Sequence, residues 1–125
     1  MPTDRRWLAI ALGGAAGSLA RWAVVGSADD PSWSWPVLVV NVIGGAVLGW
    51  LVGRGGLASA SATAGVGVGF CGGLTTMSAL AVEVAGLARD HRTGAAVAYL
   101  AATVGLGLAA SWGGHLVGSR RQETP

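Results

Sequence analysis

The sequence contains few charged residues, and one basic residue type is missing altogether. It has eight basic and six acidic residues among 125, and every basic residue is arginine, so lysine is absent. A soluble domain normally has about a quarter of its residues charged, whereas this chain has 11%. Because 52% of the residues are hydrophobic and 22 others are glycine, too few polar side chains remain to cover a water-exposed surface. We therefore expect a single integral membrane domain.

Other absences exclude several classes of function. The single cysteine, Cys71, excludes an intrachain disulfide and a metal site built from several thiolates. No basic patch is interleaved with aromatic residues, which argues against nucleic-acid binding. The sequence shows no nucleophile paired with a base, no cluster of metal-ligating side chains and no phosphate-binding loop, so we do not expect an enzyme.

Four apolar segments are each close to, or longer than, the ~20 residues that cross a bilayer as a helix. They cover residues 7–26, 35–53, 58–87 and 94–117. We predict an all-α membrane protein with four transmembrane helices. With the N-terminus inside, five arginines lie in the cytoplasmic segments and two in the outer segments. The positive-inside rule therefore favours cytoplasmic termini, and the arginine-only, Ala/Val/Gly-rich composition suggests a bacterial cell membrane.

The third segment carries an interruption rich in glycine and hydroxyl residues, 69–78 (GFCGGLTTMS). A membrane accepts non-helical backbone only where protein buries it or where it lines a polar cavity, so we predict a break in mid-membrane over residues 72–76. Unwinding there would free backbone carbonyls, which are hard oxygen donors suited to a small alkali cation. The alternative is a glycine kink that serves only packing.

Glycines recur four residues apart, which places each set on one helix face and allows close backbone approach. We expect these faces to pack tightly against a second subunit, most simply in a two-fold dimer. The sets are Gly13 and Gly17; Gly45, Gly49 and Gly53; Gly65, Gly69 and Gly73; and Gly114 and Gly118.

Polar residues inside the spans need a reason, because they are costly in hydrocarbon. Asn41 lies about two turns into the second span and offers amide donors either to a pathway or to another helix. Tyr99, Thr103 and Ser111 follow one side of the fourth span. This stripe could pass an anion from donor to donor, or Thr103 and Ser111 could bond back to their own helix.

Two charged residues lie near the outer ends of the spans. Arg21 either extends its guanidinium to the interface or lines an anion entrance. Glu83, the only acid within the apolar runs, either pairs with Arg21 or Arg89 or reaches water. No carboxylate lies deep in a span, where it would repel an anion.

These motifs together resemble the Fluc/CrcB family of fluoride channels. The resemblance is carried by residues 13–17 (GGAAG) with Arg21, by 41–45 (NVIGG) and above all by 69–78, and it extends over all four spans. It implies an antiparallel dimer with two pores, passive and selective export of fluoride, and a structural sodium ion at the dimer centre. By the same resemblance, backbone carbonyls of Gly72 and Thr75 from each subunit hold the sodium.

The resemblance also implies the fluoride pathway and its vestibule. The expected pathway residues are Asn41, Met77, Ser78, Leu80, Tyr99, Thr103 and Ser111, with Arg21 and Glu83 in the vestibule. The family usually shows TTFSTF where residues 75–80 read TTMSAL, so Met77 and Leu80 replace two aromatic rings that present their edges to fluoride.

The missing rings and the one-sided charge bias lead to a hypothesis about the assembly. We expect the chain to form either a homodimer or one half of a heterodimer with an oppositely oriented paralogue that keeps the rings. A non-conducting scaffold subunit is an alternative. A small multidrug exporter is a weaker one, because it needs a membrane-embedded carboxylate that the first span lacks.

Overall fold

The computed structural model describes residues 2–26 and 34–123, and all regular secondary structure within them is helical. Four stretches are long and apolar enough to cross a membrane: Thr3–Val25, Trp35–Gly53, Ala60–Arg89 and Thr93–Arg120. The first, second and fourth are the helices α1 (Pro2–Val25), α2 (Trp35–Gly53) and α6 (Thr93–Arg120). The predicted all-α, four-span architecture is confirmed, and the chain is a multi-pass membrane protein.

The third span is built from four helical pieces with a break before the last. The pieces are α3 (Ala60–Ala64), the π-helix η1 (Gly65–Cys71), α4 (Gly72–Leu74) and α5 (Met77–Arg89). Between α4 and α5, Thr75 and Thr76 are extended, with φ and ψ of −79° and 152° and of −147° and 122°. The predicted break is therefore present, but it is shorter than residues 72–76: Gly72 and Gly73 stay helical in α4, and the unwound backbone is confined to these two threonines.

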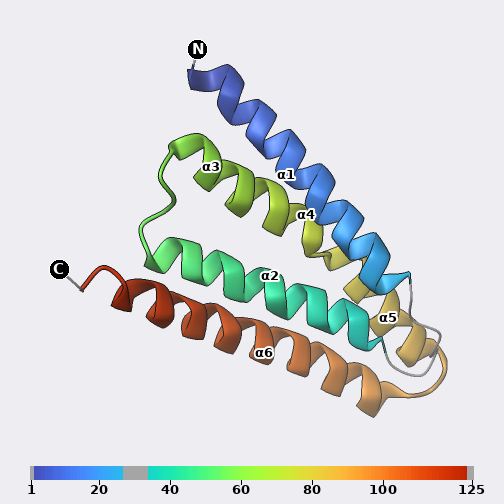
Figure 1. The fold of residues 1–125 in the computed structure, drawn as a ribbon. Coiled ribbons are helices and arrows are strands. Elements are labelled where there is room, and N and C mark those ends of the chain that lie inside the picture. Colours follow the sequence, from blue (N-terminus) through green and yellow to red (C-terminus); the bar gives the residue numbers. More distant parts are fainter. Residues whose placement is uncertain (1, 27–33, 124–125) are drawn as a thin grey trace.

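The helices form two pairs that converge near α5 and spread apart toward the chain termini (Figure 1). In one pair α1 lies along α3, η1 and α4, and in the other α2 lies along α6. The connection from α2 to α3 bridges the open end and turns at Gly55 and Gly56, whose φ angles of 78° and 97° favour glycine.

Glycines hold each pair together by letting a backbone carbonyl of the partner helix take the place of a side chain. A Cβ atom on Gly13 would overlap the carbonyl oxygen of Gly65, and one on Gly49 would overlap that of Ser111. The four-residue glycine faces thus pack within one chain. This corrects the expectation that they serve a second subunit.

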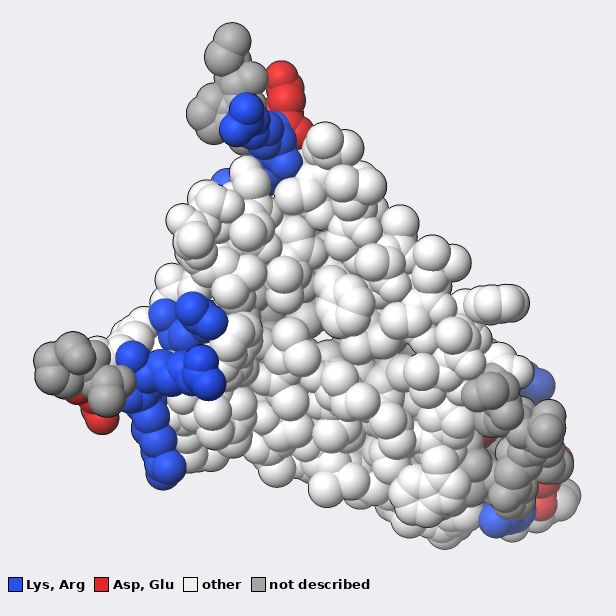
Figure 2. Space-filling view, in the orientation of Figure 1, with Lys and Arg blue, Asp and Glu red and all other residues white. Residues whose placement is uncertain are grey.

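A cluster of buried apolar residues lies at the end where the pairs converge. It comprises Val37, Leu38, Leu80, Leu87, Ala96 and Tyr99. Many large apolar side chains elsewhere are exposed, which suits a chain surrounded by lipid or by another membrane subunit. In Figure 2 the arginines gather at the ends of the molecule and the band between them is uncharged.

Candidate functional site

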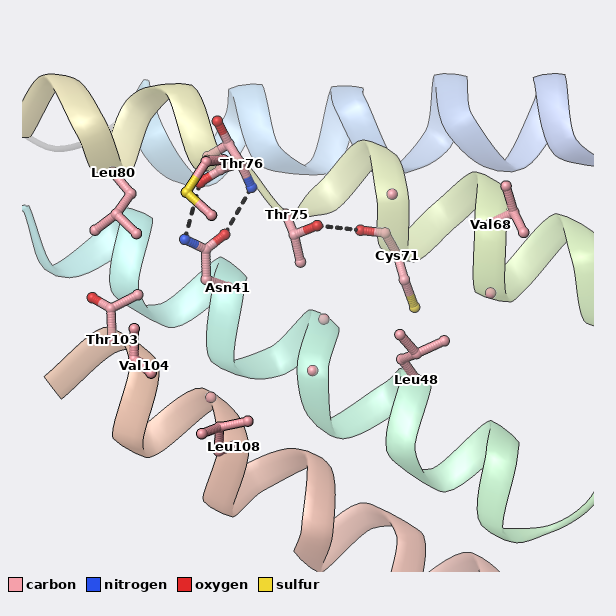
Figure 3. A pocket seen from close by; sticks show the side chains of 16 residues that line it. Asn41, Leu48, Val68, Cys71, Thr75, Thr76, Leu80, Thr103, Val104 and Leu108 are labelled. Atoms are coloured by element: carbon pink, nitrogen blue, oxygen red, sulfur yellow. Dashed lines mark hydrogen bonds between the residues drawn. The ribbon is translucent and has the colours of Figure 1, made fainter. Parts of the chain in front are cut away.

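A groove of about 550 Å³ lies between the two helix pairs, beside the break in the third span. Its walls are mostly apolar and come from α2, the third span and α6 (Figure 3). Six of the predicted site residues line it: Asn41, Gly72, Thr75, Met77, Leu80 and Thr103. The structure therefore brings the second-span asparagine, the break and part of the fourth-span track into one place.

Asn41 reaches from α2 to the unwound backbone. Its Nδ2 donates a hydrogen bond to the carbonyl of Thr76 at 3.1 Å, and its Oδ1 accepts one from the Thr76 N–H at 2.8 Å (Figure 3). A primary amide has two N–H donors, and the second has no partner within residues 2–26 and 34–123. Asn41 can therefore join two spans and still offer one donor to the groove.

The hydroxyls of the break are engaged locally. Thr75 Oγ1 donates to the carbonyl of Cys71 at 2.8 Å, and Thr76 Oγ1 accepts from the N–H of Ala79 at 3.2 Å. Thr76 thus caps the start of α5, and its hydroxyl also lies 3.1 Å from that of Ser78. Thr76 was missing from the predicted site residues, although a threonine directly before a helix restart is a common N-cap.

The fourth-span hydroxyls do not form one line in this chain. Tyr99 is fully buried in the core and its hydroxyl donates to the carbonyl of Ser34 at 2.9 Å. Thr103 faces the groove, but its hydroxyl donates to the carbonyl of Tyr99 at 2.8 Å. Ser111 lines a separate cavity of about 400 Å³ near Trp112 and His115. For Thr103, the structure shows the back-bonded alternative.

Arg21 lies between the break and a cavity near the C-terminal end of α1. Its Nη1 donates to the carbonyl of Thr75 at 3.4 Å, and the side chain also lines a cavity of about 370 Å³. Ser78 and Ser18 line this cavity too, and Ser18 was not singled out from the sequence. Glu83 is half-buried on α5 and does not line it. The structure therefore places Arg21 at the break and does not group it with Glu83.

Backbone oxygens are the available ligands for a cation here. The described part of the chain has no group of three His, Cys, Asp or Glu side chains that could hold a metal. The Thr76 N–H, which a continuing helix would donate to the Gly72 carbonyl, is bound by Asn41 instead. Gly72 is exposed, with open space where a Cβ would be. Its freed carbonyl and that of Thr75 fit a small alkali cation, which prefers hard oxygen donors.

Comparison with known proteins extends over most of the chain. Residues 8–115 match the family model described as CrcB-like protein, Camphor Resistance (CrcB). The fluoride-specific ion channel FluC 2 of Rhodococcus jostii (strain RHA1) is 46% identical over 107 residues, which is 84% of this chain and 91% of the relative. The fluoride-specific ion channel FluC of Caulobacter vibrioides (strain NA1000 / CB15N) is 40% identical over 117 residues, covering 88% and 92%. The fluoride-specific ion channel FluC 1 of Mycobacterium tuberculosis (strain CDC 1551 / Oshkosh) is 38% identical over 112 residues, covering 85% and 84%.

Proposed function

The chain is a member of the CrcB family, and from this premise we propose that it forms a fluoride-specific channel. Fluoride would leave the cell passively through it, which lowers the cytoplasmic fluoride concentration. The observation that carries the proposal is the similarity to relatives named fluoride-specific ion channels over more than four fifths of the chain. The family match over residues 8–115 covers the broken third span and the groove beside it.

The groups around the break suit a small, strongly hydrated anion. A pore must replace the water around such an ion with hydrogen-bond donors, and the spare N–H of Asn41 and the hydroxyl of Ser78 are of this kind. The guanidinium of Arg21 lines the cavity near the C-terminal end of α1, which is the outer end in the proposed orientation, and would raise the local anion concentration there. Met77 and Leu80 supply apolar wall only.

The groove walls support a dimer. Val68, Met77 and Leu108 line the groove and are 64%, 77% and 68% exposed, so a second subunit would bury apolar surface there. In an antiparallel dimer, the carbonyls of Gly72 and Thr75 from both chains would meet at the centre and hold a structural sodium ion. Bound there, the ion would neutralise the facing oxygens and join the two broken spans.

The charges support one preferred orientation. Arg5 and Arg6 lie near the start of α1, Arg54 caps α2 and Arg120 ends α6, all at the open end of the two pairs (Figures 1 and 2). This favours cytoplasmic termini in a bacterial cell membrane. A moderate bias of this kind within one chain favours a heterodimer with an oppositely oriented paralogue, and the numbered names of relatives, FluC 1 and FluC 2, are compatible with paired chains.

A flux assay tests the proposal directly. Purified protein, alone or with an oppositely biased paralogue, is reconstituted into liposomes loaded with potassium fluoride, and a potassium ionophore starts the efflux. We expect a fluoride electrode to record rapid release of fluoride. A chloride electrode should record no comparable release from vesicles loaded with potassium chloride. Equal release of both anions, or no release from either assembly, would contradict a fluoride-specific channel.

A second candidate, a non-conducting subunit that supports a working partner, is favoured by Met77 and Leu80 in place of rings. The variant Met77→Phe separates the two, because Met77 is 77% exposed and a ring fits there without displacing the core. If the chain is a scaffold through loss of the rings, Met77→Phe should raise the efflux of the single-chain assembly. If the unchanged protein and Met77→Phe show equal and substantial efflux, the scaffold is excluded.

A further inference from the structure

The unwound backbone at Thr75 and Thr76 has hydrogen-bond partners even though it lies inside a membrane span. The N–H of Thr75 donates to the carbonyl of Cys71 at 3.0 Å, which is the last helical bond before the break. The next three groups are the Thr75 carbonyl, the Thr76 N–H and the Thr76 carbonyl, and Arg21 and Asn41 bind them. An unpaired peptide group is costly in hydrocarbon, and these two side chains supply the bonds that the unwound residues need.

Asn41 competes with Gly72 for one amide hydrogen. In an uninterrupted helix the Thr76 N–H would donate to the carbonyl of Gly72, four residues earlier. It donates to Asn41 Oδ1 instead, and Asn41 Nδ2 returns a bond to the carbonyl of the same residue (Figure 3). Two such bonds to one residue are what a neighbouring β-strand provides, so they stabilise extended backbone at Thr76.

Arg21 acts on the other half of the same peptide bond. It reaches the break because α1 approaches closely at Gly17 and Gly73; a Cβ on Gly17 would overlap the carbonyl oxygen of Phe70. The bond from Arg21 to the Thr75 carbonyl is long at 3.4 Å, so Arg21 contributes less than Asn41. Its positive charge also lies near the C-terminal end of the helical run from α3 to α4, where a cation is favourable.

We propose that Asn41 and Arg21 are positioning residues that hold the third span open at the peptide bond between Thr75 and Thr76. Asn41 removes the helical donor from the Gly72 carbonyl, and Arg21 restrains the Thr75 carbonyl. Without Asn41, the Thr76 N–H returns to Gly72 and the helix continues through the break. The hydrogen bonds of Asn41 and Arg21 to the break form what we call the clamp, and it belongs to a single chain. The consequence for sodium rests on the proposed function.

The composition of the chain allows a direct test in the unchanged protein. Asn41 is the only asparagine, and residues 75 and 76 are the only adjacent threonines. Protein in lipid, labelled with ¹⁵N in the asparagine side chain and ¹³C in the threonine carbonyls, should show a close dipolar contact between Asn41 Nδ2 and one carbonyl, that of Thr76. The absence of this contact would overturn the clamp.

Variants then test what the clamp does. With threonine labelled in both carbonyl ¹³C and amide ¹⁵N, the peptide bond between Thr75 and Thr76 gives the only directly bonded labelled pair, and its carbonyl shift reports extended or helical backbone. We expect the signal to move toward the helical position in Asn41→Leu and to move less in Arg21→Leu. Thr103→Val removes a hydroxyl from the same groove without touching the clamp and should leave the signal in place. An unmoved signal in folded Asn41→Leu would refute the proposal.

The sodium consequence is measured separately. The thermal midpoint of the purified protein is followed as sodium replaces potassium at constant ionic strength. We expect sodium to raise the midpoint of the unchanged protein and expect at least tenfold more sodium to be needed in Asn41→Leu. If sodium has no effect on the unchanged protein, the proposed ion site fails. The clamp then stands or falls on the labelled signals alone.

Discussion

Both helix pairs are held together by glycine, yet only one of them contains a break. Between α2 and α6 the contacts have equal spacing on the two helices: Gly49 and Gly53 face the carbonyls of Ser111 and His115, which are also four residues apart. Between α1 and the third span the spacing is unequal. Gly13 and Gly17 face the carbonyls of Gly65 and Phe70, which are five residues apart. The π-helix η1 takes up the extra residue in its wider turns.

The difference shows that glycine permits an irregular span but does not create the break. Both pairs have close backbone contact, and α6 stays helical from Thr93 to Arg120 despite its glycines. The third span differs in having Asn41 and Arg21 aimed at its backbone from two other spans. Side chains that satisfy unwound peptide groups therefore distinguish a broken membrane helix from a continuous one.

The largest expected effect comes from adding one methyl group at the glycine contacts. Gly49→Ala should lower the free energy of unfolding by about 3 kcal/mol, because the new Cβ overlaps the backbone of Ser111 in a pair that keeps strict register. Gly13→Ala should cost about half as much, since the π-helix can shift by part of a turn. Both are measured by equilibrium unfolding in mixed micelles.

The matched control is Gly105→Ala on α6, where a Cβ meets nothing within 4 Å. It should leave the free energy of unfolding nearly unchanged. If Gly13→Ala and Gly49→Ala prove equally costly, the broken pair is as rigid as the continuous one, and the register argument is wrong.

The second effect concerns the cap at the break. Thr76→Ala should lower the free energy of unfolding by about 2 kcal/mol, because the freed Ala79 N–H has no water to replace the lost acceptor. Ser59→Ala removes the same kind of bond, to the N–H of Ala62, at an exposed loop. It should cost about 0.5 kcal/mol. Equal costs, measured in the same way, would mean that water reaches the break.

How far the sequence predicted this structure depends on how local each feature is. The spans and the break were predictable because segment length, apolar composition and the hydroxyl-rich interruption are properties of short stretches, although Gly72 and Gly73, which lay inside the predicted break, stay helical in α4. The pairing of Asn41 with Thr76 was not, because the two residues are 35 positions apart and meet only through packing. The resemblance marked Asn41 as important without indicating its hydrogen bonds.

The helix against which each glycine face packs could not be predicted from the sequence either. Four-residue spacing is the same whether a face packs against its own chain or against another, so Gly13 and Gly17 were assigned to a subunit interface. The π-helix left no signal either, because residues 65–71 are glycines and apolar residues, like most of α6. Its cause is the register with α1, which is a tertiary effect.

The third effect lies in the continuous pair. Tyr99→Phe keeps the buried ring and removes the hydroxyl that donates to Ser34 at the start of α2. The carbonyl of Ser34 still accepts from the N–H of Leu38 at 3.4 Å, so the loss should be about 1 kcal/mol in free energy of unfolding. A loss as large as that of Thr76→Ala would show that the continuous pair also depends on a polar contact between its helices.

The smallest expected effect is on transport and concerns Thr103. Its hydroxyl donates to the carbonyl of Tyr99, so the proton is turned toward its own helix and away from the groove. Thr103→Val keeps the shape of the side chain and should change fluoride efflux by less than about twofold, because no hydrogen bond to fluoride is lost. Losing such a bond would cost about 1 kcal/mol, or roughly fivefold in efflux. Asn41→Leu, measured in the same vesicles, should reduce efflux more than tenfold. A fivefold loss in Thr103→Val would mean that the hydroxyl leaves the Tyr99 carbonyl to donate to fluoride, and the continuous pair would then supply a pore donor of its own.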